Sequence, residues 1–146
     1  KERGDALKWV FFMSNSLHAG LRQMFYPEKF IAPEFSVPFR DATAQRIFTD
    51  FKQVNDLIAD PACSCLGGPQ FSILDIYACV CLRWAQLYPN DYKAGWLQAD
   101  DFPSLQALAA RLETHPATVK SQTAEGLGPT PFTAPIHAKP PQGSAT

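Results

Sequence analysis

His18 is the residue of this chain whose type best suits acid–base chemistry, because an imidazole gains or loses a proton near neutral pH. The spacing of apolar residues predicts that it lies on a helix over 5–25. Ser14 and Arg22 stand one turn before and after it, so the three side chains are expected to share a face. That face is either the wall of a binding site or a seam in which His18 is simply hydrogen-bonded and Arg22 is a solvated charge.

The four cysteines form two C-x-C pairs, Cys63 with Cys65 and Cys79 with Cys81. The second pair falls in a predicted helix, where two residues apart means about 200° around the axis, so the thiols diverge. The first pair falls in a predicted loop and could chelate an ion, but no histidine is near it in sequence. We therefore expect four reduced cysteines that behave as small apolar residues, and no metal.

The segment 71–76 contains the clearest helix start in the chain. Ser72 is predicted to cap the helix, with Asp75 returning a bond to the Ser72 N–H in a capping box. Phe71 and Ile76 occupy the positions of a hydrophobic staple. The helix that follows, 73–87, is apolar nearly all round, which is typical of a buried helix. A buried carboxylate such as Asp75 can do acid–base work, but the capping box predicts a structural role instead.

The helix over 5–25 carries apolar residues on more than one face. Such a helix is expected to contact a second domain or a second subunit as well as its own core. Three prolines predict a loop over 26–40, and Asp41 is the predicted cap of an amphipathic helix that ends near Asp60.

Pro103 begins another predicted helix, which His115-Pro116 interrupts, and a last short helix over 117–125 stops at Gly126. No segment shows the alternation of a strand. The chain is thus predicted to be all-α, with a helical domain over 1–126. Residues 127–146 contain five prolines and are expected to form an extended tail, whose first half packs on the domain through Phe132 and Ile136.

Composition narrows the classes of function. The chain has 146 residues, of which 46% are hydrophobic and 18% charged, with a formal net charge of -1. This is the composition of a globular domain, and the near-neutral charge argues against a nucleic-acid partner. No apolar run reaches the length of a membrane span. The chain lacks an initiator methionine and begins close to a helix, so we expect it to be part of a longer polypeptide.

Three stretches together resemble the C-terminal helical domain of glutathione S-transferases, the bacterial beta class in particular. They are WVFFMSNSLH at 9–18, GPQFSILDIY at 68–77 followed by LRWA at 82–85, and the stretch from FPSL at 102–105 through HP at 115–116 to AEGL at 124–127. The resemblance implies a thioredoxin-like domain, absent from this chain, that binds most of the glutathione. It also implies a homodimer, a cytoplasmic location and a role in detoxification.

The resemblance assigns candidate residues to the first helix, which in the family lines the pocket for the hydrophobic co-substrate. His18 matches a histidine that the beta class places near the glutathione thiol, where it could donate a hydrogen bond or stabilise the thiolate. Phe11 stands where relatives can carry an asparagine that reaches glutathione across the dimer, and Ala19 stands where that class often has lysine. Both departures make the site more apolar. Ser14 and Arg22 complete the predicted substrate-binding set.

Two classes of function follow from the resemblance. The parent protein is expected to conjugate glutathione to small hydrophobic electrophiles, with this chain alone inactive. The alternative is a non-catalytic interaction module, as similar domains are in elongation factor gamma subunits and some tRNA synthetase complexes. Thiol-dependent reductase, peroxidase or dehalogenase activity is a third option, since the missing domain would decide the reaction.

Overall fold

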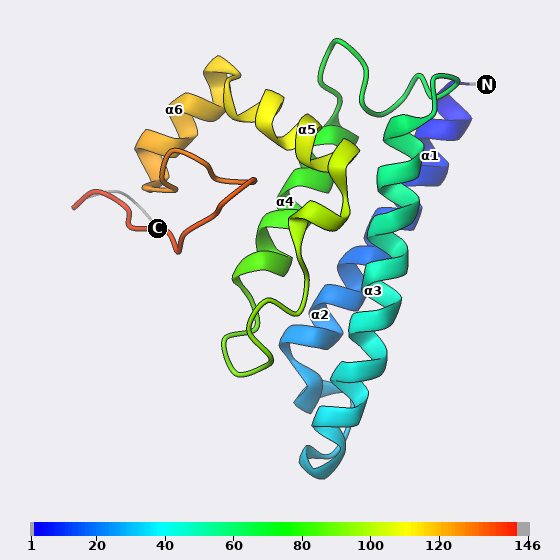
Figure 1. Cartoon of the computed structure of the whole chain (residues 1–146), viewed down its shortest axis with the longest axis vertical. Helices are drawn as coiled ribbons and strands as arrows, with labels where there is room; N and C mark the ends of the chain where they lie inside the picture. Colours follow the sequence, from blue (N-terminus) through cyan, green and yellow to red (C-terminus); the bar gives the residue numbers. More distant parts are fainter. Residues whose placement is uncertain (1, 143–146) are drawn as a thin grey trace.

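The computed structural model describes residues 2–142, and within them the secondary structure is entirely helical, as predicted. The opening run consists of α1 (Glu2–Phe12), a π turn (Met13–His18) and α2 (Ala19–Phe25). It lies beside α3 (Ser36–Ala59), which runs back along it (Figure 1). Helix α4 (Ile73–Leu87) packs against the opening run, and α5 (Pro103–Glu113) packs against α3 and α4. Among the described residues, no helix combines the length and hydropathy needed to cross a bilayer.

The π turn is the first departure from the sequence-based expectation of one regular helix over 5–25. A π turn bonds each N–H to the carbonyl five residues earlier, so it inserts one residue into the helix. One inserted residue rotates the following face by about 100° relative to the preceding one. The buried residues nevertheless keep one stripe across the turn, because Met13, Leu17 and Leu21 follow at intervals of four residues and are all fully buried.

The core forms where the helices meet, and each helix contributes residues at helical spacing. The opening run contributes Met13 and Leu17 from the π turn, with Leu21 and Met24 from α2, and all four side chains are fully buried. Their partners come from α3, α4, the residue before α5 and α5 itself: Ile47, Phe51, Val54, Leu74, Ala78, Leu82, Phe102, Leu105, Leu108 and Leu112. One continuous core thus holds the bundle together.

The region between α2 and α3 is more helical than predicted. Residues 27–29 and 33–35 form two short 3₁₀ turns, and α3 already begins at Ser36, so the predicted loop over 26–40 is wrong from that residue onward. Pro38 falls in the first turn of α3, where the backbone N–H groups have no helical partner to lose. Asp41 is consequently not a cap, and its carboxylate accepts hydrogen bonds from Tyr92 and Lys93 instead.

The capping box at the start of α4 is confirmed, and the helix spans the predicted residues 73–87. The Asp75 carboxylate accepts from the Ser72 N–H at 2.6 Å and also from the Gly67 N–H at 2.7 Å. The helix is not buried all round, however, because Ile73 and Ile76 are 69% and 43% exposed. These two residues are three positions apart and share one side of the first turn, which remains in solvent. The Phe71 ring packs edge-on to His115.

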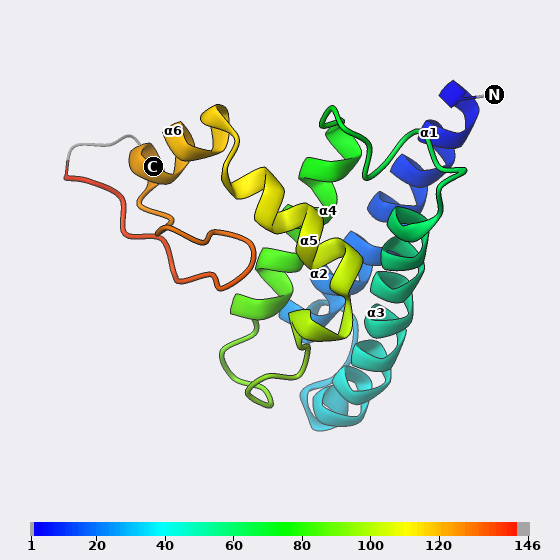
Figure 2. The ribbon, with the colours of Figure 1, turned by 45° about the horizontal axis from the view of Figure 1, so that its top comes forward.

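The last elements follow the predicted pattern. Helix α5 begins at Pro103, and α6 (Pro116–Glu125) ends at Gly126, whose φ of 62° is the left-handed conformation that favours glycine. The tail leaves α6 and returns along it, as Figure 2 shows. Phe132 is buried as expected, but Ile136 is largely exposed. Residues 143–146 of the predicted tail lie outside the described residues.

Candidate functional site

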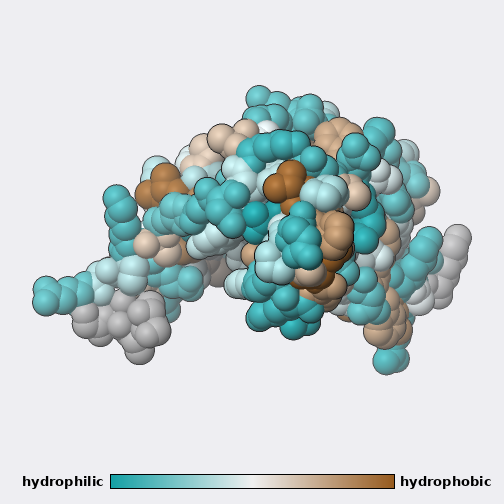
Figure 3. All heavy atoms as spheres, turned by 90° about the horizontal axis from the view of Figure 1, so that it is seen from below, coloured by the Kyte–Doolittle hydropathy of each residue, from teal (hydrophilic) through white to brown (hydrophobic). Residues whose placement is uncertain are grey.

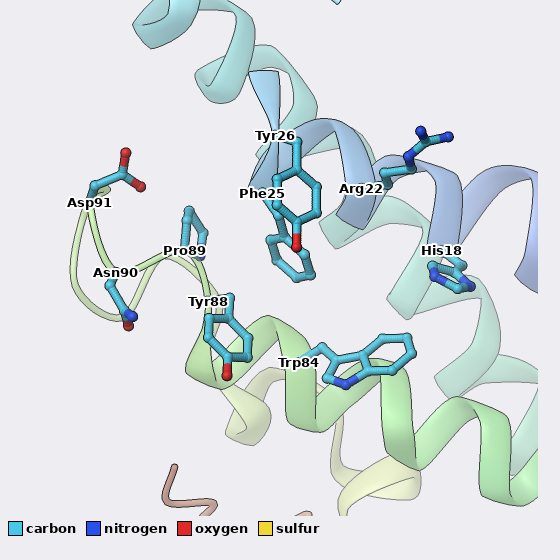
Figure 4. A pocket seen from close by; sticks show the side chains of 9 residues that line it. All are labelled: His18, Arg22, Phe25, Tyr26, Trp84, Tyr88, Pro89, Asn90 and Asp91. Atoms are coloured by element: carbon cyan, nitrogen blue, oxygen red, sulfur yellow. The ribbon is translucent and has the colours of Figure 1, made fainter. Parts of the chain in front are cut away.

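A pocket of about 600 Å³ opens between α2 and α4, beside the segment that follows α4 (Figure 4). Its lining is mainly aromatic, with one histidine and one arginine from the opening helical run: His18, Arg22, Phe25, Tyr26, Trp84, Tyr88, Pro89, Asn90 and Asp91. Pockets with apolar walls and a few polar groups are typical of small-molecule sites.

His18 stands at the end of the π turn, and two contacts from α4 hold its ring. Its Nδ1 lies 2.7 Å from the Tyr77 hydroxyl oxygen, and its ring centroid lies 5.1 Å from that of Trp84. Burial raises the pKa of Tyr77, so this hydroxyl keeps its proton through the range in which a histidine titrates. When the imidazole is neutral, Tyr77 can donate to Nδ1, which leaves the Nε2–H of His18 as a donor towards a ligand.

The aromatic wall comes from two helix ends. Trp84 and Tyr88 are four residues apart at the end of α4 and share a face, and Phe25 at the end of α2 packs edge-on to Tyr88 at 5.8 Å. Sequence reasoning placed Trp84 only within a buried helix and missed Phe25, Tyr26 and Tyr88. One signal was available: Tyr26 and Tyr88 each precede a proline that follows a helix.

Arg22 supplies a positive charge at the rim of the pocket. Figure 4 shows its side chain extending away from Trp84, and its guanidinium lies 5.8 Å from the ring centroid of Phe30. Within residues 2–142, no carboxylate lies at ion-pair distance from it. The carboxylate of Asp91, on the opposite side, is already paired with Arg40 at 3.1 Å. The uncompensated charge at the pocket is therefore positive.

The structure separates the predicted substrate-binding residues into two groups. His18 and Arg22 both line the pocket, as their spacing predicts. Ser14 does not line it, and its hydroxyl donates to the Phe11 carbonyl at 3.2 Å. Phe11 is 60% exposed and lies on the part of the helix that precedes the π turn. The pocket begins at His18 and extends along α2, so Ser14, one turn earlier, lies outside its lining.

The remaining candidates have structural surroundings. Ser72 and Asp75 form the cap of α4 and lie outside the aromatic pocket. Cys79 and Cys81 are fully buried, and burial raises the pKa of Cys81 to about 12. Within the described residues, no three histidine, cysteine or acidic side chains come together as metal ligands would.

Taken together, the pocket combines a positioned imidazole, aromatic walls and a positive rim. This arrangement can bind a flat apolar molecule and offer a hydrogen bond or proton to it or to a neighbouring anion. Comparison of the chain with family models, with curated proteins and with solved structures gives no match.

Proposed function

We propose that this chain is the C-terminal helical domain of a glutathione transferase, and that the pocket between α2 and α4 binds the hydrophobic co-substrate. The single observation that carries this proposal is the position of His18, which resembles the beta-class histidine in sequence and lies on an aromatic pocket. Glutathione would be bound mainly by a thioredoxin-like domain of the parent polypeptide. Phe25, Trp84 and Tyr88 would hold the electrophile by apolar contact.

In this proposal His18 assists the glutathione thiolate. Its Nε2–H, freed by the Tyr77 contact, would donate a hydrogen bond to the sulfur or to the leaving group. Arg22 would add positive potential at the rim, which favours an anionic partner. Since hydrogen bonds to charged groups contribute about 1.5–3 kcal/mol, loss of the imidazole should slow conjugation by about tenfold or more.

The experiment uses the full polypeptide that contains residues 1–146. It should be retained on immobilised glutathione and should conjugate glutathione to chlorodinitrobenzene, as absorbance of the product records. His18→Ala should reduce the rate by about tenfold, whereas His115→Ala, which changes an exposed histidine outside the pocket, should not. Failure both to bind glutathione and to conjugate would overturn the proposal. Equal rates for the two variants would remove His18 from the mechanism.

One observation favours the alternative of a non-catalytic interaction module. Leu7 and Phe11 on α1 are 47% and 60% exposed, and this apolar surface is available to another polypeptide. The end of the molecule seen from below presents mostly hydrophilic atoms with separate hydrophobic patches (Figure 3).

In a homodimeric transferase, the exposed α1 residues would lie in the subunit interface. The double variant Leu7→Ser, Phe11→Ser should then be a monomer in light scattering. If the double variant instead loses a different partner protein and its self-association is unchanged, the interaction module is favoured.

A further inference from the structure

The segment between α3 and α4 brings two cysteine sulfurs together. The Sγ atoms of Cys63 and Cys65 lie 3.7 Å apart. Both residues are half-buried, whereas Cys79 and Cys81 are fully enclosed in the core. From the sequence, all four cysteines were expected to be reduced and to behave as small apolar residues. The structure divides them into an accessible, convergent pair and an enclosed pair.

The geometry of the accessible pair suits a disulfide. A disulfide has a sulfur–sulfur distance of about 2.05 Å, which rotation of side chains in a non-helical segment can reach from 3.7 Å. The same spacing within a helix would direct the sulfurs apart. Cys79 and Cys81 on α4 have that helical spacing, so they form no equivalent pair.

Contacts on both sides of the pair hold this arrangement. Before it, the Cys63 N–H donates to the Asp60 carbonyl at 3.0 Å. The Ser72 hydroxyl lies 3.0 Å from the Cys65 carbonyl oxygen, and the Gly67 N–H donates to Asp75 at 2.7 Å. Leu66, next to Cys65, is buried in the core. The two sulfurs are therefore anchored to the cap of α4, and their proximity does not depend on a free loop.

Cys65 of this pair is also reachable by small molecules. Cys65 lines a shallow pocket of about 300 Å³ between α1 and the segment before α4, together with Val10 and Ser64. Ser64, between the two cysteines, is exposed. A hydroperoxide is small enough to enter such a pocket, whereas the sulfurs in the core are shielded from it.

We propose that Cys63 and Cys65 form a dithiol site that reduces a hydroperoxide and closes to an intrachain disulfide. The thiolate of one of the two cysteines attacks the peroxide oxygen, the O–O bond breaks, and an alcohol or water leaves with a proton, so that this cysteine becomes a sulfenic acid. The sulfur of the other cysteine then attacks the oxidised sulfur, and the S–O bond breaks. Hydroxide leaves and takes the proton of the second thiol as water. Two thiols and one hydroperoxide thus give one disulfide, one alcohol and one water.

Burial and the neighbouring Cys63 raise the pKa of Cys65 to about 11, so this thiol keeps its proton near neutral pH. This inference is independent of the proposed transferase function, since it involves neither His18 nor the aromatic pocket.

The test treats the folded chain with hydrogen peroxide and counts thiols that react with a disulfide reagent. Before treatment two thiols should react in the native state. After treatment none should react, and the mass should fall by that of two hydrogen atoms. Chymotrypsin, which cleaves after Phe71, should release a peptide in which Cys63 is linked to Cys65, separate from Cys79 and Cys81. Dithiothreitol should restore both thiols.

Variants test whether both sulfurs are needed. In Cys63→Ser and in Cys65→Ser no intrachain disulfide should form, and dimedone should trap a sulfenic acid on the cysteine that remains. Cys79→Ala serves as the matched control and should still form the disulfide. Unchanged thiol counts after peroxide, a bond to Cys79 or Cys81, or disulfide-linked dimers in place of the intrachain bond would each overturn the proposal.

Discussion

The Nδ1 of His18 and the hydroxyl oxygen of Tyr77 lie 2.7 Å apart, which joins the π turn of the opening run to the middle of α4. The two residues are 59 positions apart in sequence, and their rings also meet edge to face at 5.8 Å. This contact fixes which face of the imidazole is turned towards the aromatic pocket. It is the interaction by which the fold orients the main candidate residue.

Replacing Tyr77 with phenylalanine should release the imidazole. The loss of one part-buried hydrogen bond should lower the free energy of unfolding by about 0.5–1.5 kcal/mol, measured by urea denaturation. The nitrogen chemical shifts of His18 in NMR should report a changed tautomer. Tyr26→Phe removes a hydroxyl at the same pocket without removing this bond, and it should leave both measurements unchanged. A Tyr77→Phe variant with an unaltered His18 spectrum would contradict the orienting role.

Removal of the cap of α4 should destabilise the fold. Ser72→Ala should lower the free energy of unfolding by about 0.5–2 kcal/mol, the usual range for loss of a cap. Asp75→Ala should cost more than Ser72→Ala, because it also leaves the Gly67 N–H without its acceptor. Asp56→Ala, at an exposed position of α3, is the control and should change stability by less than about 0.5 kcal/mol. Equal melting temperatures for Asp75→Ala and Asp56→Ala would disprove this account.

Asp50 should make stability depend on pH. This residue of α3 is nearly buried, and within the described residues its Oδ2 has no hydrogen-bond partner. Burial raises its pKa above the ordinary value of 3.8, so the folded state holds the proton more tightly than the unfolded state. Its contribution to stability is therefore present at low pH and is lost as pH rises from 3.8 through the raised folded value.

Asp50→Asn removes the buried charge and should raise the melting temperature at pH 7. The advantage over the wild type should shrink as pH falls below the folded pKa, because protonation then neutralises the native carboxyl as well. Thermal denaturation across a pH series measures this. Asp60→Asn, at an exposed position after α3, is the comparison. A constant difference between Asp50→Asn and wild type at every pH would show that the charge is not the cause.

Arg83 should hold the tail on the bundle. Its guanidinium donates to the carbonyls of Pro131 at 2.9 Å and Ile136 at 2.8 Å. Arg83→Met removes both donors. The free energy of unfolding should fall by about 1–3 kcal/mol for each carbonyl that stays buried without a hydrogen-bond partner. Limited chymotryptic cleavage after Phe132 should then be at least about tenfold faster, because local opening becomes more frequent. Lys120→Met, at an exposed position of α6, should leave the cleavage rate unchanged.

Local sequence determined much of the helical pattern. The capping box, the bounds of α4, the start of α5 at Pro103 and the stop of α6 at Gly126 were all predicted, because each depends on residues within one turn. The segment 26–40 was assigned wrongly from Ser36 onward, because a proline also fits the first turn of a helix, and its earlier part contains two short 3₁₀ turns. The π turn was missed, because helical periodicity is read over a window in which one inserted residue is not visible.

The sequence by itself determined the all-helical class, the order of most helices and the choice of His18 and Arg22 as neighbours on one helix. Only the tertiary structure decided that these two residues meet Trp84 and Tyr88 across a pocket, while Phe11 stays exposed. It also decided that the Cys63 and Cys65 sulfurs converge. The physical reason is that a helix start depends on hydrogen bonds a few residues long, whereas a pocket depends on how separate helices pack, and packing is set by contacts between residues far apart in the chain.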